Sequence, residues 1–198
     1  MVLELNIPDT GIELSFPNGL SNEAFEELCF SNKELLVERE SDGKIIVMSP
    51  VSGTSGDNEA EFIADLKFYE RKHGGKAFSS NTGFTLPDPS LKSPDACYVS
   101  AEKMQHITSE DMLHFVAVVP DFVVEVISPT DSLKTSRSKM TDSWMANGVR
   151  LGWLVDVKSE KLWIYRQDGS VDIIKGFNQT ITGEDVVPGF EFDLRNLM

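Results

Sequence analysis

The sequence predicts a mixed fold of the α/β or α+β class, in which a central β-sheet is flanked by helices. The run 121–127 (DFVVEVI) is β-branched and almost wholly apolar, which is typical of a strand covered on both faces. An amphipathic stretch at 132–146 follows it, and a second apolar run at 151–157 (LGWLVDV) comes next. Strand, helix and strand in this order predict a parallel pair with a right-handed crossover.

The first half of the chain alternates helix and strand signals. Asp42-Gly43 between two apolar runs favours a hairpin, and the glycines between 53 and 56 indicate a loop. We therefore expect the long helix to begin near Asp57, as its N-cap, and to end before Gly74. The expected elements are a helix at 21–30, strands at 34–39 and 44–48, a helix at 57–73, strands at 77–80, 83–86 and 95–99, and partial helix at 101–113.

The second half is richer in strand signals. The helix at 132–146 carries Leu133, Met140 and Trp144 on one face, which we expect to pack against the sheet. Asp168-Gly169 favours a hairpin between strands at 161–166 and 171–175. The tail at 186–192 should add an edge strand or a covering loop. The sheet is thus expected to carry β-hairpins toward both its N-terminal and C-terminal ends.

Length and composition favour one domain over residues 1–198, with 1–20 as an N-terminal extension. The chain has 198 residues, of which 40% are hydrophobic and 25% charged, and this balance excludes wholesale disorder. We expect no membrane span, because every long apolar run is interrupted, and no secretory signal. Cys29 and Cys97 lack metal-site spacing, so we expect two free thiols in a protein of the reducing cytoplasm.

The charge balance constrains the partners of the molecule. Lys and Arg number 18 against 32 Asp and Glu, which gives 18 − 32 = −14, and the pI is about 4.6. A molecule with this charge repels phosphates as a whole, so it does not coat nucleic acid non-specifically. Binding to DNA would require a local basic strip or a metal ion.

Glu125 is the unusual residue of the best strand. It lies among Phe122, Val123 and Val124 on one side and Val126 and Ile127 on the other. An unpaired carboxylate in such a strand would cost several kcal/mol, so it needs a metal, a cation or a proton as partner. A strand-end glutamate open to solvent and a buried structural ion pair are alternative interpretations.

Asp95 follows Ser93-Pro94 at the start of another predicted strand. Taken alone, this aspartate is typical of a turn. Two carboxylates on adjacent strands, Asp95 and Glu125, can instead hold a hard divalent cation such as Mg²⁺. Such a site suits phosphodiester hydrolysis.

A lysine near the two carboxylates would assist this chemistry. The position two residues after Glu125 is Ile127, so the strand itself supplies none. The next helix carries Lys134, Arg137 and Lys139, and the long stem of Lys139 can reach along the sheet. The alternative for Lys139 is an ordinary solvated lysine.

Other acidic and histidine residues are assigned structural roles or none. We expect Glu59 and Glu61 to be solvated glutamates of the long helix. Asp156, near the end of its strand, is expected to make a cap or turn contact. The three histidines have no metal-ligand spacing.

Several stretches together resemble the PD-(D/E)XK nuclease superfamily and, more narrowly, the bacterial Uma-type restriction endonuclease family. The resemblance covers roughly 20–197. The matching stretches are Ser93-Pro94-Asp95, the run 120–129 (PDFVVEVISP), Glu38-Arg39 before Asp42-Gly43, the run 45–50 (IIVMSP), the run 147–156 (NGVRLGWLVD) and the tail 187–190 (VPGF).

The resemblance implies a restriction-endonuclease-like core at 21–198 and a metal-dependent site. Within it, Asp95 and Glu125 would be metal-binding and catalytic, with Mg²⁺ or Mn²⁺ as the ion. Lys139 would replace the missing strand lysine, and Glu38 would be an additional acid near the metal. The implied substrate is DNA, and symmetric homodimers occur among such folds. Two alternatives remain open: an inactive binding or regulatory module, and a phosphodiesterase for RNA or a small nucleotide.

Overall fold

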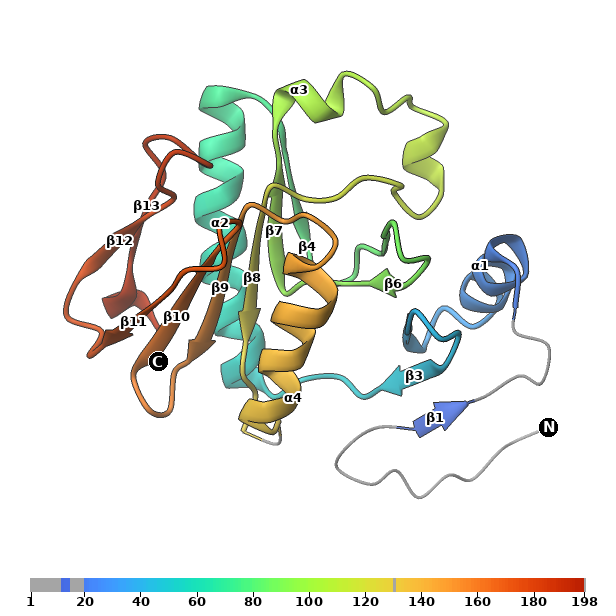
Figure 1. Cartoon of the computed structure of the whole chain (residues 1–198), viewed down its shortest axis with the longest axis horizontal. Helices are drawn as coiled ribbons and strands as arrows, with labels where there is room; N and C mark the ends of the chain where they lie inside the picture. The colour runs from blue at the N-terminus through green and yellow to red at the C-terminus, as the bar shows by residue number, and fades with distance from the viewer. Residues whose placement is uncertain (1–11, 15–19, 130, 198) are drawn as a thin grey trace.

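The computed structural model describes residues 12–14, 20–129 and 131–197. Most of the expected N-terminal extension, 1–20, lies outside these described residues. Figure 1 shows a larger sheet with helices on both of its faces and a smaller sheet beside it. The predicted mixed fold is therefore confirmed, and the separate smaller sheet is a feature that the sequence did not reveal.

The larger sheet has six strands in the order β11-β10-β9-β8-β7-β4. Its centre is β8 (Phe122–Val126), which is buried along its whole length. The neighbour β9 (Leu151–Asp156) runs parallel to β8, with Glu125 opposite Leu154, and this confirms the predicted parallel pair. The other strand pairs are antiparallel, and their members are β4 (Lys76–Ser79), β7 (Ala96–Val99), β10 (Lys161–Arg166) and β11 (Val171–Lys175).

Helices cover both faces of this sheet (Figure 1). On one face, α2 (Gly53–His73) packs Phe62 and Leu66 against the side chains of β8 that point that way. On the other face, the helix after β8 packs Met140 and Trp144 against the alternate side chains of the sheet. Because neighbouring strand residues point to opposite faces, Glu125 shares the second face with Val123.

The smaller sheet has the order β1-β3-β2-β6-β5. It contains the predicted hairpin of β2 (Leu36–Arg39) and β3 (Ile45–Met48). The first helix, α1 (Asn22–Ser31), packs Phe25 onto Ile45 and Leu91 of this sheet. The remaining strands are β1 (Ile12–Leu14), β5 (Phe84–Thr85) and β6 (Leu91–Lys92).

Short elements complete the chain. The predicted hairpin of β10 and β11 is confirmed, and the tail forms a two-stranded sheet of β12 (Thr180–Thr182) and β13 (Glu191–Asp193) before the 3₁₀ helix η3 (Leu194–Asn196). The region 101–113 is helical only in α3 (Ala101–Met104) and in the 3₁₀ helix η1 (Asp111–Leu113). Over the described residues, no helix has both the length and the apolar character needed to cross a membrane.

Two helix boundaries differ from expectation. The predicted start of α2 at Asp57 is wrong, because Ser52 caps the helix by accepting a hydrogen bond from Ser55 N at 3.2 Å. The predicted helix at 132–146 divides into α4 (Leu133–Ser138) and the π-helical segment η2 (Lys139–Met145). The wider π-helical turn changes the angle between residues, so Leu133 lies away from the buried stripe and is 38% exposed.

Gly152 of β9 allows η2 to pack closely on the sheet. A Cβ atom at this position would clash with the Met140 sulfur and would lie 3.4 Å from the Met145 sulfur. Met140 is fully buried, and Gly152 is buried as well. The glycine therefore sets the distance between the sheet and the segment that begins with Lys139.

Candidate active site

The pairing of β7 with β8 brings Asp95 and Glu125 together. Ala96 lies opposite Val124 in this antiparallel pair, so the residue before Ala96 lies alongside the residue after Val124. Side chains opposite one another in a sheet share a face. Asp95 also accepts a hydrogen bond through Oδ2 from Val126 N at 2.6 Å, which fixes its carboxylate beside the end of β8.

Glu125 is 7% exposed and is held by two side chains of η2. Its Oε1 accepts a hydrogen bond from Trp144 Nε1 at 2.6 Å and lies 3.0 Å from Lys139 Nζ. The sequence predicted that an acid in this strand needs a partner, and the partner is the ammonium of Lys139. Of the two alternatives left open for Glu125, the solvent-facing strand end is wrong.

Lys139 is the central cation among three acidic side chains, Glu38, Asp95 and Glu125, which we call the acidic cluster. Its Nζ lies 3.0 Å from Glu125 Oε1 and 3.0 Å from Glu38 Oε1, and it donates to the Ser93 carbonyl at 2.9 Å. Its side chain is 22% exposed, so the interpretation as a freely solvated lysine is wrong. Ile127 occupies the strand position two residues after Glu125, and the amine comes from the following helical segment instead.

Glu38 joins the smaller sheet to this cluster. It is buried, and its Oε1 accepts from Ser93 N at 3.0 Å while its Oε2 lies 3.2 Å from Lys92 Nζ. Lys92 is only 2% exposed and also contacts Glu40. Sequence reasoning missed Lys92. Its only signal was its position three residues before Asp95, at a point where the short strand β6 was not predicted.

The pKa values of the two facing carboxyls are raised. Burial raises the pKa of Asp95 to about 7; Lys139 opposes this effect, and Glu59 and Glu38 add to the rise. Burial likewise raises the pKa of Glu125 to about 8, again opposed by Lys139, with Asp95 and Glu38 adding to the rise. The site is therefore suited to a cation that displaces protons from these two acids.

Glu38 and Lys139 stay charged. Burial disfavours the ionised form of Glu38, but Lys139, Lys92 and the Ser93 amide outweigh it and lower the pKa. Burial also disfavours the ammonium of Lys139, but Glu125, Glu38 and Asp95 raise its pKa above the ordinary value. The two groups form a fixed ion pair beside the titrating carboxyls.

Glu59 also belongs to this neighbourhood. It was expected to be a solvated helix glutamate, which is wrong, because it lies on the inward side of α2 and is only 8% exposed. Burial raises its pKa, the Ser80 side chain lowers it, and Glu125 raises it again. Glu61 is half-buried on the same helix.

The carboxylate oxygens fit a hard divalent cation. Among the described residues, Asp95 Oδ1 and Glu125 Oε2 have no hydrogen-bond or ion-pair partner, whereas the other oxygen of each carboxylate is held by protein donors. No set of three or more His, Cys, Asp or Glu side chains in the described residues is arranged to hold a metal. Mg²⁺ does not need such a set, because it takes one or two carboxylates together with water and phosphate oxygens.

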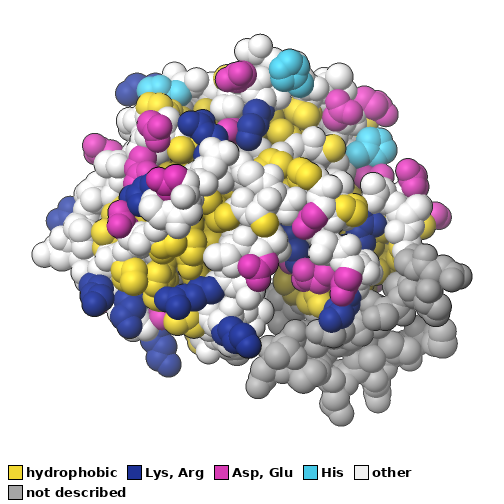
Figure 2. Space-filling model, viewed as in Figure 1, with side chains coloured by type: hydrophobic (Ala, Val, Ile, Leu, Met, Phe, Trp, Pro, Cys, Tyr) yellow, Lys and Arg dark blue, Asp and Glu magenta, His cyan; other side chains and the backbone are white. Residues whose placement is uncertain are grey.

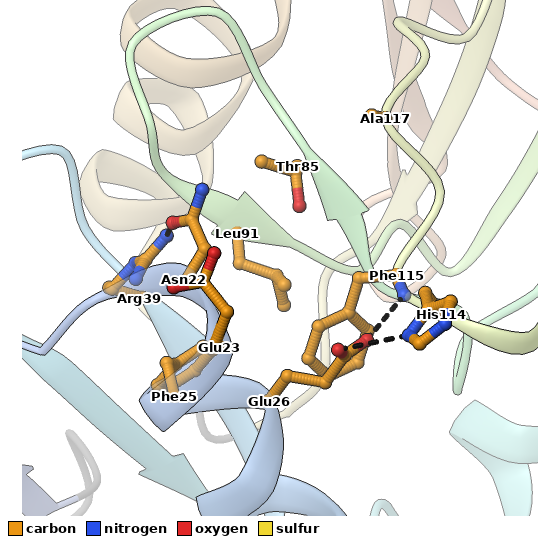
Figure 3. A pocket seen from close by; sticks show the side chains of 10 residues that line it. All are labelled: Asn22, Glu23, Phe25, Glu26, Arg39, Thr85, Leu91, His114, Phe115 and Ala117. Atoms are coloured by element: carbon orange, nitrogen blue, oxygen red, sulfur yellow. Dashed lines mark hydrogen bonds and ion pairs between the residues drawn. The ribbon is translucent and has the colours of Figure 1, made fainter. Parts of the chain in front are cut away.

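A separate hollow of about 210 Å³ lies between α1 and the segment before β8 (Figure 3). Its Glu26 holds His114 Nδ1 and Phe115 N, each at 3.0 Å. Arg39 lines it and bonds the Pro89 carbonyl at 2.8 Å, whereas the preceding residue of β2, Glu38, belongs to the acidic cluster. The contacts of Glu26 attach α1 to the segment before β8. The residues that line the hollow do not include Asp95 or Glu125.

Asp156 makes the turn contact that its position predicted. It accepts hydrogen bonds from Ser159 N at 3.1 Å and from Ser159 Oγ at 2.6 Å. The two cysteines, Cys29 and Cys97, are both free thiols. None of these three residues belongs to the acidic cluster.

Comparison with known proteins identifies the family. Residues 22–195 match the model of the Uma2 family, whose description is "Putative restriction endonuclease". No curated protein matches the chain. Among solved structures, a crystal structure described as that of a putative nuclease belonging to DUF820 from Anabaena variabilis is similar in fold. The TM-score is 0.68, the identity is 17%, and the match covers 81% of this chain and 88% of that one. The chain is therefore a member of the Uma2 family of restriction-endonuclease-like proteins.

Proposed function

We propose that this chain hydrolyses phosphodiester bonds of DNA with the help of a divalent cation. The cation is Mg²⁺, with Mn²⁺ as an effective substitute. The observation that carries the proposal is the pair of facing carboxylates, half-buried Asp95 and buried Glu125, with Lys139 Nζ 3.0 Å from Glu125 Oε1. Membership of the Uma2 family supports it independently.

The roles of the side chains follow from their contacts. Asp95 and Glu125 would hold the cation, because each keeps one carboxylate oxygen that no donor of the described residues occupies. When bound, the cation neutralises charge on the phosphate and lowers the pKa of water. The Lys139 ammonium lies beside the same carboxylate, where it stabilises negative charge that develops on the phosphate oxygens. Glu38 and the Ser93 carbonyl keep this ammonium in place.

A nicking assay on supercoiled plasmid tests the proposal. Purified wild type is compared with Asp95→Ala and Glu125→Ala in Mg²⁺, in Mn²⁺ and in EDTA. We expect nicking only by the wild type and only with a divalent ion. Equal nicking by all three proteins would mean that the activity comes from elsewhere, and the proposal would be wrong.

An inactive binding or regulatory module is the second candidate. The observation in its favour is that Lys139 and Trp144 already satisfy Glu125 Oε1, as they would in a purely structural buried ion pair. This candidate predicts no nicking by any form of the protein. The same assay with single-stranded RNA and with cyclic dinucleotides separates DNA cleavage from a phosphodiesterase of different substrate.

A further inference from the structure

Five exposed cations on one side of the larger sheet form no ion pair with any described residue. Acids outnumber bases 32 to 18 in this chain, and seven of the other 13 Lys and Arg residues form ion pairs with described acids. The exposed side chains that form no ion pair with any described residue include a group on α4, in the turn between β9 and β10, and on β10 and β11: Lys134, Arg137, Lys158, Lys161 and Lys175. We call these five residues the basic strip.

The strand registers place part of the basic strip on the same face as Glu125. Glu125 is opposite Leu154, Leu154 is opposite Trp163, and Trp163 is opposite Ile173, so these four share one face. The next row on this face, two residues further along each strand, contains Asp156, then Lys161, then Lys175. Lys161 and Lys175 therefore lie on the face of the acidic cluster.

The distance between the strip and the acidic cluster is short. Adjacent strands lie about 4.8 Å apart, so β10 is about 10 Å and β11 about 14 Å from β8. Arg137 of α4 contacts β10, because its guanidinium lies over the Trp163 ring, 4.8 Å from the ring centre. Lys134, one helical turn before Arg137, lies on the same side of α4.

Figure 2 shows this arrangement on the surface. Dark-blue side chains gather at the lower left, over the region where Figure 1 places the lower ends of α4, β9, β10 and β11. Acidic side chains gather elsewhere on this face. A molecule with a net charge of −14 needs such a local basic strip if it is to bind DNA.

The direct pairing of Lys161 with Lys175 is unfavourable in the free protein. Like charges directly opposite one another in a sheet destabilise it, and no ion pair with a described residue relieves these two. Asp156 lies opposite Lys161 in the β9–β10 pair, but its carboxylate is engaged by Ser159. Glu160 is exposed, and Asp172, the acid nearest to Lys175 in sequence, pairs with Arg166. An anionic partner would remove the repulsion.

We infer that the basic strip binds the sugar–phosphate backbone of DNA and leads it to the Asp95–Glu125 pair. This inference rests on the proposed function, because it takes DNA as the partner. It adds where the backbone lies: along the α4 and β10–β11 side of the acidic cluster. Phosphate contacts of this kind fix position without reading sequence.

Fluorescence anisotropy with a labelled 24-base-pair duplex, in EDTA so that no cleavage occurs, tests the inference on the full chain. The test variant is Lys161→Glu/Lys175→Glu, with Lys161→Ala/Lys175→Ala as a milder form. The matched control is Lys33→Glu/Lys72→Glu, which makes the same charge change at exposed lysines outside the strip. Circular dichroism and thermal melting confirm that each variant folds.

We expect the test variant to bind about tenfold or more weakly than wild type in low salt. We expect each alanine to lower the slope of log affinity against log salt by about 1. The control should stay within a fewfold of wild type. Equal losses in test and control variants, a wild type that binds no duplex, or a loss seen only with RNA of the same sequence would each overturn the inference.

The outcomes separate the inference from the proposed function. If the strip variants lose DNA binding while the wild type nicks no plasmid, the strip stands and the catalytic proposal fails. If Asp95→Ala abolishes nicking while the strip variants bind and nick like wild type, the catalytic proposal stands and the strip fails. Each claim therefore has its own contradicting result.

Discussion

Lys139 lies 3.0 Å from Glu125 although the two residues come from different elements, a π-helical segment and a strand. The strand position at which a lysine would have shared the face of Glu125 is Ile127. The Lys139 amine therefore approaches the Glu125 carboxylate from the helical segment that covers the sheet, and not from the strand that carries Glu125. This relationship makes Lys139 the first residue to test.

Lys139→Met should reduce nicking by about 10²–10³-fold, because one preorganised charge near the reacting phosphate is lost. The pKa of Glu125 should also rise further, since Lys139 holds it down. Lys72→Met, an exposed lysine at the end of α2, is the control and should nick like wild type. Single-turnover rates measure the effect, and an unchanged rate in Lys139→Met would remove this residue from the site.

Mg²⁺ affinity should increase with pH. The pKa values of Asp95 and Glu125 are raised to about 7 and about 8, so a cation must displace protons below these values. Titration calorimetry at pH 6 and pH 9 should show tighter binding at pH 9 and proton release at pH 6. Asp95→Asn should weaken binding at both values, and pH-independent affinity would contradict the prediction.

Stability without metal should fall as pH rises. The folded carboxyls titrate near 7 and 8, whereas those of the unfolded chain titrate near 4, so the folded state binds more protons between these values. The stabilising contribution of the protonated forms is complete below about pH 4 and is lost as pH passes through 7 to 8. The Tm should therefore be lower at pH 9 than at pH 5.5, by about 2–4 °C for each kcal/mol of stability lost in a chain of this size.

Glu125→Gln is the informative variant for that experiment. It keeps the shape of the side chain and removes one of the two titrating groups. Its Tm should depend less on pH than that of the wild type. An identical pH dependence in both proteins would show that Glu125 does not titrate in this range.

Lys92→Met should destabilise the fold by about 3–5 kcal/mol, because it leaves Glu38 buried with a cation on one side only. Lys67→Met is the matched control. It breaks the half-exposed pair of Lys67 with Glu70 on α2 and should cost less than about 1 kcal/mol. Urea unfolding measures both, and equal costs would mean that the buried bridge adds nothing to stability.

Gly152→Ala should cost about 1–3 kcal/mol, since the added methyl group meets the Met140 sulfur in a packed core. The shift of η2 away from β9 would also move Lys139, so nicking should fall together with stability. Gly53→Ala is the control, because a Cβ there has no atom within 4 Å and lies at the start of α2. Its stability should match or slightly exceed that of wild type.

Much of the larger sheet was predictable, because apolar runs and Asp-Gly turns mark it locally. The parallel pair of β8 and β9 and the hairpin of β10 and β11 follow from such patterns. The two-residue strand β6, which joins the predicted β5 to the predicted hairpin of β2 and β3, carries no periodic signal of its own, so the smaller sheet was missed. The start of α2 was missed because Gly53 and Gly56 weaken local helix propensity, which the Ser52 cap offsets.

The site was predictable in part for a similar reason. An acid in an apolar strand, as at Glu125, is visible in the sequence because it conflicts with its neighbours. Lys92 and Glu59 sit among polar residues and give no such signal, and only the tertiary fold buries them. The contact of Glu38 with Lys139 joins two sheets, and no local pattern specifies it.

The ion pair of Glu38 with Lys139 also connects the smaller sheet to the segment that covers the larger sheet. Glu38 belongs to β2 of the smaller sheet, and Lys139 begins the segment that covers the larger one. Because the pKa of Glu38 is lowered, its contribution persists into mild acid and is lost only as pH falls through that lowered value. Strong acid should therefore separate the two sheets and break up the acidic cluster in one transition, so that the folded structure and the activity are lost at the same pH.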